Sequence, residues 1–184
     1  MDLEIKTADE LVDAALEARW AARRADRQGE ALQAVLRAFL AREGPVPVED
    51  IEAALAPRLA DMVRDALAAL DAQDLILLRG GRIELAYPFS GIPTDFTVVF
   101  PDGRTRHACC AIDALGIASM LGTPIRIRSR CHDCRAPLEL TAEPEGPGPE
   151  AAGIMVWVGR WGEGARDLAG GPAGDPNCRV ADSL

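Results

Sequence analysis

The sequence predicts an α+β protein: an N-terminal winged-helix-like helical domain, then a small mixed β-sheet domain carrying a cysteine-bearing helix. Two observations predict this order. Apolar residues recur at helical spacing as far as residue 70, and from residue 75 short apolar runs alternate with turn residues. We expect a helical domain over residues 1–88, an α+β core over 89–160, and a Gly/Pro-rich tail over 161–184.

Helical spacing is clearest in the first part of the chain. Leu32, Val35, Leu36, Phe39 and Leu40 follow the i, i+3, i+4, i+7, i+8 pattern of an amphipathic helix, which Gly44-Pro45 should end. Further helices are expected over residues 8–25, 47–55 and 59–70, followed by a β-hairpin over 75–87 that turns at Gly80-Gly81.

Three helices and a hairpin form a winged-helix arrangement, in which the third helix can enter a DNA groove. Here that helix, Arg58–Asp71, places Arg58 and Arg64 against Asp61, Asp65 and Asp71, so its charge balance is negative. The whole chain carries a net charge of −9, whereas binding to phosphates depends on Lys and Arg. We therefore expect this domain to serve as a packing and lid element, without a nucleic-acid partner.

The second domain should be built from short strands around one helix. Residues 87–94 form a turn-rich linker, and Phe96–His107 form a hairpin that turns at Pro101-Asp-Gly103. Ile125 and Ile127 alternate with arginines as a strand with one wet face. Further strands are expected near residues 138–140 and over 154–158, with an exposed loop over 143–153 between them.

Size, composition and cysteine content set the class of protein. The 184 residues, 48% of them hydrophobic, can bury a substantial core. No apolar run approaches the ~20 residues of a membrane span, and the first residues lack the features of a secretory signal. We therefore expect a cytoplasmic protein without a membrane partner, in which the five cysteines serve metal binding or catalysis rather than disulfides.

The segment 106–121 carries the candidate chemistry. Cys109 and Cys110 precede small and apolar residues, and Asp113 is the one charge among them. Residues three apart in a helix share a side, so Cys110 and Asp113 should lie within reach of each other, and a helix start should favour a thiolate at Cys110. The pattern is compatible with a buried cysteine beside a capping aspartate, and also with a nucleophilic sulfur beside a proton carrier.

The order of several motifs resembles the organomercurial (alkylmercury) lyase family. The resemblance rests on Tyr87-Pro-Phe-Ser-Gly-Ile-Pro-Thr94, the following hairpin, Cys110-Ala-Ile-Asp113 and the segment 125–137, and it covers roughly residues 30–142. It implies a lyase that breaks a carbon–mercury bond by protonolysis, yielding a hydrocarbon and thiol-bound Hg(II). It also implies that no organic cofactor is required and that Hg(II) can pass to a mercuric reductase or to small thiols.

The resemblance also implies roles for individual residues. Cys110 would bind mercury, because thiophilic metals prefer thiolate ligands, and Asp113 would relay a proton to the departing carbon. The second thiol would come from a distant cysteine toward the C-terminus, where Cys178 is the candidate. Should Cys178 not reach Cys110, Cys109 is the substitute, although neighbouring helical residues diverge by about 100°.

Cys131-His-Asp-Cys134 is a second cysteine cluster. Two cysteines at this spacing are half of a zinc site, so zinc, an auxiliary mercury-capturing dithiol and structural cysteines all remain open. The competing hypothesis is a metal-binding or metal-sensing protein on the same scaffold, in which Cys110, Cys131, Cys134 and Cys178 hold a metal and the helical domain contacts DNA or protein.

Overall fold

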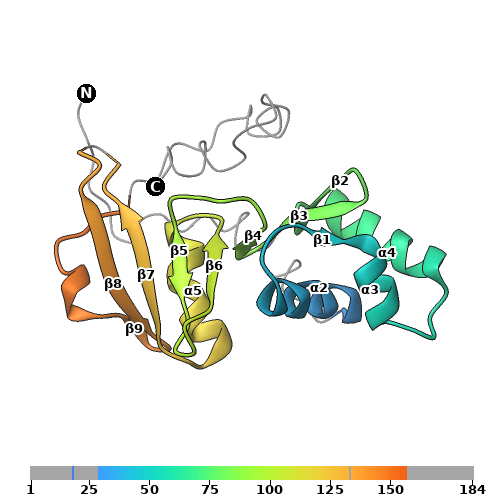
Figure 1. The fold of residues 1–184 in the computed structure, drawn as a ribbon, viewed down its shortest axis with the longest axis horizontal. Coiled ribbons are helices and arrows are strands. Elements are labelled where there is room, and N and C mark those ends of the chain that lie inside the picture. Colours follow the sequence, from blue (N-terminus) through green and yellow to red (C-terminus); the bar gives the residue numbers. More distant parts are fainter. Residues whose placement is uncertain (1–17, 19–28, 133, 157–184) are drawn as a thin grey trace.

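The computed structural model describes residue 18 and residues 29–132 and 134–156 (Figure 1). The helix expected over residues 8–25 falls outside this part of the chain except for residue 18. The tail 161–184, with Cys178, lies outside it entirely.

Three helices of the N-terminal half lie where the apolar spacing predicts them: α2 (Glu30–Ala41), α3 (Val48–Ala54) and α4 (Ala60–Ala72). In α2 the side chains of Leu32, Val35 and Phe39 are buried, as the pattern requires. The three helices pack against one another around a shared core. None of the described helices is long and apolar enough to cross a membrane.

A hairpin follows the helices, as expected. Strands β2 (Ile76–Arg79) and β3 (Arg82–Ala86) pair in antiparallel fashion around the glycine turn, and the short β1 (Val46–Pro47) pairs with the other edge of β3. Gly80 and Gly81 both have positive φ angles, which explains why the turn uses glycine.

The second half contains one helix and several strands. The predicted hairpin, cysteine helix and two following strands are confirmed as β5 (Thr97–Val99), β6 (Thr105–Ala108), α5 (Ala111–Leu121), β7 (Ile125–Arg130) and β8 (Pro137–Glu143). Ile125 and Ile127 are buried while Arg126 and Arg128 are exposed, which is the alternation that the sequence predicts.

Three expectations about the connecting segments are corrected. The linker 87–94 contains a strand, β4 (Phe89–Ser90), and the loop 143–153 contains β9 (Gly146–Pro147) and the 3-10 helix η2 (Pro149–Ala151). Residues 154–156 form no strand and are exposed, because they follow η2 without a neighbouring strand to pair with among the described residues.

The strands of the described chain join into a single nine-stranded sheet of order β1-β3-β4-β6-β5-β7-β8-β9, with β2 also on β3. The expectation of a mixed sheet is wrong, because all of these pairings are antiparallel. The crossover through α5 does make β6 and β7 run in the same direction, but β5 lies between them and pairs with both. The two-residue strand β4 connects the sheet of the helical half to that of the cysteine-bearing half.

The helical half and the cysteine-bearing half lie at opposite ends of the molecule (Figure 1). A single cluster of buried apolar side chains nevertheless runs through both of them. In it, Phe39 of α2 stacks on Phe89 of β4, with ring centroids 6.4 Å apart. Helix α5 covers the sheet through contacts with β6, β7, β8 and β9.

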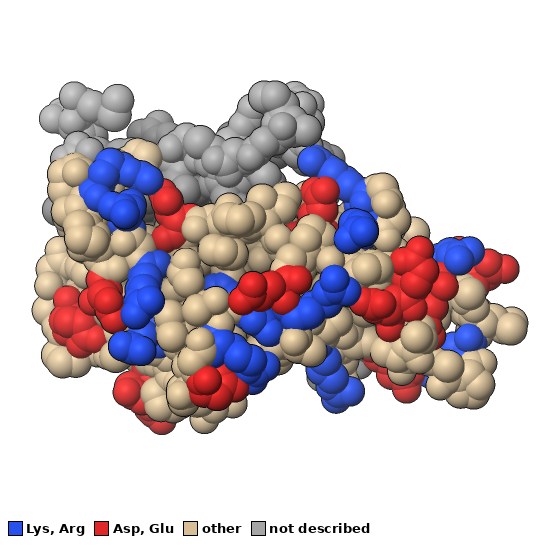
Figure 2. Space-filling view, viewed as in Figure 1, with Lys and Arg blue, Asp and Glu red and all other residues tan. Residues whose placement is uncertain are grey.

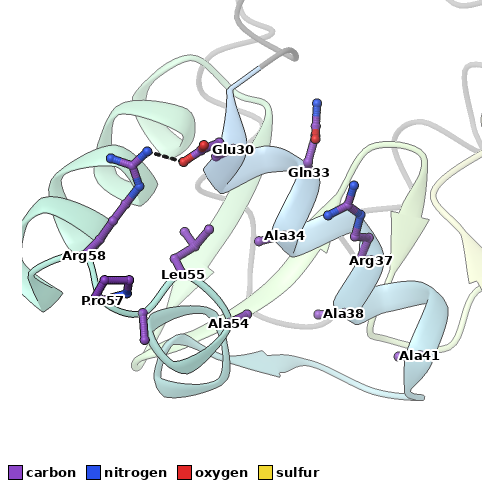
Figure 3. A pocket seen from close by; sticks show the side chains of 11 residues that line it. Glu30, Gln33, Ala34, Arg37, Ala38, Ala41, Ala54, Leu55, Pro57 and Arg58 are labelled. Carbon is purple, nitrogen blue, oxygen red and sulfur yellow. Dashed lines mark hydrogen bonds and ion pairs between the residues drawn. The ribbon is translucent and has the colours of Figure 1, made fainter.

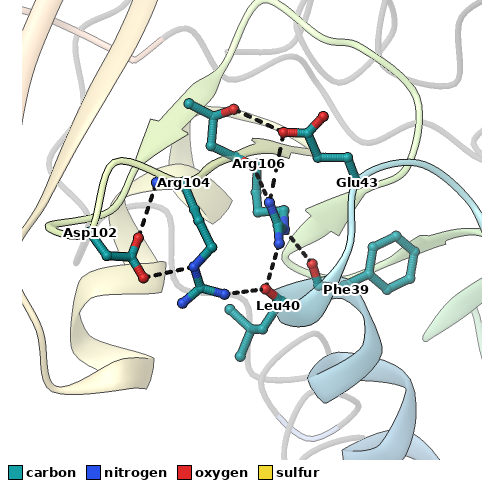
Figure 4. Close-up of polar contacts among 7 residues, drawn as sticks. Phe39, Leu40, Glu43, Asp102, Arg104 and Arg106 are labelled. Atoms are coloured by element: carbon teal, nitrogen blue, oxygen red, sulfur yellow. Dashed lines mark hydrogen bonds and ion pairs between the residues drawn. The ribbon is translucent and has the colours of Figure 1, made fainter.

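Arg106 of β6 connects the two halves through hydrogen bonds to the backbone of α2 (Figure 4). Its buried guanidinium donates from Nε to the Phe39 carbonyl at 2.6 Å, from Nη2 to the Leu40 carbonyl at 2.6 Å and from Nη1 to the Thr105 carbonyl at 2.5 Å. The first two carbonyls belong to the last turn of α2, where helical partners are missing and a positive charge is favourable. Arg104 donates to the same Leu40 carbonyl at 2.8 Å.

Gly91 marks a second close approach between the halves. A Cβ atom at this position would lie 2.7 Å from the Pro45 nitrogen and 2.8 Å from its Cα, both of them backbone atoms. Glycine is therefore required here because there is no space for a side chain. The φ angle of Gly91 is not positive, so its backbone conformation does not itself require glycine.

Charges of both signs alternate over the face of the molecule seen in Figure 2. Several of the arginines are held in ion pairs with carboxylates, among them Arg42 with Asp50 and Arg64 with Glu52. The described residues visible on this face form no extended basic area of the kind that binds phosphates.

Candidate active site

Cys110 and Asp113 lie in contact at the start of α5. Cys110 is the N-cap residue, with extended backbone angles (φ −154°, ψ 179°) that end the approach from β6. Its Sγ accepts a hydrogen bond from the Asp113 N–H at 3.3 Å, and its thiol donates to Asp113 Oδ2 at 3.0 Å. The proximity predicted from helical spacing is confirmed, and the capping group is the cysteine rather than the aspartate.

The segment 87–94 holds the strand that leads to Cys110. The Cys109 N–H donates to the Pro88 carbonyl at 3.0 Å, directly beyond the pairing of Phe89 with Ala108. Thr94 Oγ1 donates to the Ala108 carbonyl at 2.7 Å. The turn-rich motif therefore fixes the backbone immediately before the two cysteines.

The environment of Cys110 favours the thiol. Its exposed fraction is 6%, and burial raises its pKa well above the ordinary value of a cysteine. The negative charge of Asp113 and the hydrogen bond to it raise the pKa further, against a smaller lowering by the amides of Ile112 and Asp113. The expectation of a thiolate stabilised by the helix start is wrong for this state, because burial and the carboxylate outweigh the amide donors.

Cys109 lies deeper in the protein than its neighbour. Its exposed fraction is 0%, and burial raises its pKa well above the usual value, with further raising by Asp113 and Cys110. The two adjacent thiols are therefore both held in the protonated form near neutral pH.

Tyr87 also belongs to this cluster. Its side chain is half-buried at the turn between β3 and β4, and its pKa is raised first by burial and then by Cys109, Asp113 and Cys110. The sequence placed Tyr87 at the end of the first hairpin and in the family motif, without assigning it a role in the site. Its position near the cysteines depends on the short strand β4, which pairs with β6 and which the sequence did not predict.

His107 precedes the cysteines on β6. Its Nδ1 accepts a hydrogen bond from the Thr94 N–H at 3.4 Å, and its pKa is lowered mainly by burial. The imidazole is therefore neutral near pH 7 and is used to hold the segment 87–94 against β6.

Cys131 and Cys134 lie in the turn between β7 and β8. Thr97 of β5 pairs with His107 of β6 on one side and with Arg128 of β7 on the other. Strands β6 and β7 therefore finish at the same end of the sheet, and Cys131 follows β7 there. Cys131 is half-buried and Cys134 is exposed. Across the part of the chain that the structure describes, no three Cys, His, Asp or Glu side chains are grouped as metal ligands.

A groove of about 760 Å³ lies elsewhere, between α2 and the connection from α3 to α4 (Figure 3). Small and apolar side chains line much of it, and Arg58 and Glu30 form an ion pair across its end. Cys110 and Asp113 are not among the described residues that line this groove, so it is separate from the thiol–carboxylate pair.

The fold and this cluster define a class of protein: an α+β protein with a buried thiol hydrogen-bonded to a carboxylate at the start of a helix. Comparison with known proteins makes the class more specific. Residues 89–170 match the family model of alkylmercury lyase, which confirms the resemblance that the motifs indicated.

Individual relatives agree with the family match. The chain is 34% identical over 107 residues to an alkylmercury lyase of Staphylococcus epidermidis and 37% identical over 108 residues to one of Streptomyces lividans. Each alignment covers 58% of this chain and 47% of the relative, so the chain spans about half the length of these curated relatives.

A solved structure supports the fold. The mercury-bound form of MerB2 superposes with a TM-score of 0.52 at 23% identity, covering 65% of this chain and 58% of that one. At this identity the likeness shows a shared α+β fold.

Proposed function

We propose that the protein is an organomercurial lyase that cleaves a carbon–mercury bond by protonolysis. The observation that carries the proposal is the 3.0 Å hydrogen bond from the Cys110 thiol to Asp113, inside the region that matches the alkylmercury lyase model. A soft sulfur and a proton carrier in direct contact are the two groups that this reaction needs.

The first step is ligand exchange at Cys110. An organomercury thiolate, R–Hg–SR′, reacts with the Cys110 thiol to give Cys110–S–Hg–R and the free thiol R′SH. The new sulfur–mercury bond replaces the sulfur–hydrogen bond, and Asp113 carries the proton to the departing thiolate. The raised pKa of Cys110 means that its proton stays in the site until the soft electrophile displaces it.

The second step breaks the carbon–mercury bond. A second thiol binds mercury and loses its proton to Asp113, which delivers it to the carbon; the bonding electron pair leaves with the carbon, and the products are R–H and Hg(II) held by two sulfurs. We assign the second thiol to Cys178, which lies outside the described residues, with Cys109 as the substitute. No organic cofactor takes part.

The remaining roles follow from this assignment. We infer that the helical half is a winged-helix unit used for packing, since Arg106 fastens α2 to the cysteine-bearing strand and the face in Figure 2 has no basic area for nucleic acid. Cys131 and Cys134 would be auxiliary thiols at the same edge of the sheet, or half of a zinc site. Hg(II) would pass to a mercuric reductase or to small thiols in the cytoplasm.

Phenylmercury tests the proposal directly. Purified protein mixed with phenylmercury should release benzene, measured in the headspace by gas chromatography. Cys110→Ser should abolish release, and Asp113→Ala should lower the rate about 100-fold, since positioned proton transfer contributes roughly that factor or more. Thr123→Val, at the opposite end of α5 from Cys110, is the control and should retain activity.

A metal-binding protein without lyase activity predicts a different result. Phenylmercury would be taken up, as mass spectrometry would show, but no benzene would appear, and Asp113→Ala would change nothing. That outcome would reject the lyase proposal.

A further inference from the structure

We propose that Tyr87 is a positioning residue of this site, whose phenol O–H donates a hydrogen bond to the Asp113 carboxyl group once Cys110 has bound mercury. The inference rests on the proposed function and extends it to a residue that the family motif alone leaves without a role.

Backbone geometry brings Tyr87 to the cysteines. Phe89 pairs with Ala108 and Ser90 with His107 across β4 and β6, and the next contact in this ladder is the 3.0 Å hydrogen bond from the Cys109 N–H to the Pro88 carbonyl. Tyr87 is the residue before Pro88 and is therefore held beside the peptide that joins Cys109 and Cys110.

The surroundings of the phenol agree with this placement. Tyr87 is half-buried, and its pKa is raised first by burial, then by Cys109, Asp113 and Cys110, and last by Asp74. The first three of these residues are the two thiols and the carboxylate of the candidate active site. A phenol keeps its proton in such surroundings, so Tyr87 is a neutral hydrogen-bond donor there.

Mercury binding removes one hydrogen-bond donor from the carboxyl group. Without mercury, the Cys110 thiol donates to Asp113 Oδ2, and this contact helps to aim the carboxylate. When mercury replaces the thiol proton, that donor is lost, just before the carboxyl group must deliver a proton to carbon. A hydrogen bond from Tyr87 would keep the carboxyl group aimed at the carbon–mercury bond, which affects the rate of the chemical step more than substrate binding.

The chain offers a selective probe, because Tyr87 is its one tyrosine. Protein labelled with [13Cζ]tyrosine should give a single NMR resonance whose position reports the hydrogen bonding of this phenol. Adding phenylmercury should shift the resonance in the wild type. The shift should vanish in Cys110→Ser and fall by at least half in Asp113→Asn.

Kinetics provide the second measurement. Tyr87→Phe keeps the ring and removes the hydroxyl, and it should lower kcat about tenfold with KM changed less than about twofold, as expected for one lost hydrogen bond to a charged group. Thr123→Val removes a hydroxyl at the opposite end of α5, where it contacts the Leu121 carbonyl, and should leave kcat unchanged.

Three results would overturn the role of Tyr87. The first is an unshifted resonance when mass spectrometry shows mercury on Cys110, and the second is a wild-type kcat in Tyr87→Phe. The third is a shift of full size in Asp113→Asn, because the phenol would then sense the metal and not the carboxyl group. If the wild type releases no benzene, the proposed function fails, and the NMR measurement still decides whether Tyr87 contacts Asp113.

Discussion

Arg106 and Cys110 lie four residues apart, on either side of the end of β6, and both are 6% exposed. Arg106 faces the helical half and donates to three backbone carbonyls at 2.5 to 2.6 Å. Cys110 faces α5 and has a single proton, which it shares with one carboxylate. One segment thus carries a buried cation that donates to three backbone carbonyls and a buried thiol that donates to a single carboxylate.

The difference teaches how burial can serve stability in one place and reactivity in another. A buried cation that donates to several backbone carbonyls is costly to remove, because each of those carbonyls loses a charged donor. A buried thiol beside a carboxylate keeps its proton at neutral pH, yet a soft metal can take the place of that proton. The predictions below separate these two roles.

The largest effect on stability should come from Arg106→Met. Loss of the guanidinium leaves the Phe39 and Leu40 carbonyls without this donor, and we expect the free energy of unfolding to fall by about 3 kcal/mol in urea denaturation. Arg104→Met removes a half-exposed donor to the same Leu40 carbonyl and should cost less than about 1 kcal/mol. Equal losses in the two variants would contradict the role assigned to Arg106.

Gly91→Ala should have the next largest effect. The new Cβ would lie 2.7 Å from a backbone atom of Pro45, and backbone cannot yield as a flexible side chain can, so we expect a loss of about 2 kcal/mol in thermal or urea unfolding. Gly116→Ala is the matched control, since open space surrounds that position within α5, and it should be neutral or stabilising by about 0.5 kcal/mol. A neutral Gly91→Ala would show that the two halves are not in close contact there.

The smallest effect concerns reactivity rather than stability. The Asp113 carboxylate raises the pKa of Cys110, so Asp113→Asn should lower that pKa and increase the thiolate fraction at a given pH. We expect Cys110 to react about tenfold faster with iodoacetamide at pH 8 in Asp113→Asn, and its rate in the wild type to keep rising above pH 9. Mass spectrometry assigns the modified residue, and exposed Cys134 provides the internal standard. A slower reaction in Asp113→Asn would mean that the carboxylate acts as a base in the resting protein.

Local periodicity predicted most of the elements. The spacing of Leu32, Val35 and Phe39 gave α2, the glycine turn gave the first hairpin, and the interval from Cys110 to Asp113 gave the contact at the start of α5. These features depend on residues close together in the chain, which is why the sequence reveals them.

Features that depend on distant contacts could not be predicted in this way. Strand β4 is two residues long and exists because β3 and β6 lie on either side of it. Two of the three carbonyls that Arg106 binds, those of Phe39 and Leu40, are more than sixty residues away from it in the sequence. The protonated state of Cys110 was missed because burial, which outweighs the helix start, is a property of the folded chain.

Cys110 Sγ caps α5 by accepting the Asp113 N–H, and the same sulfur is the mercury ligand in the function proposed above. A bound soft cation would draw electron density from the lone pairs that the Asp113 amide also uses. Occupancy of the site and cohesion of the first helical turn are therefore coupled through a single atom.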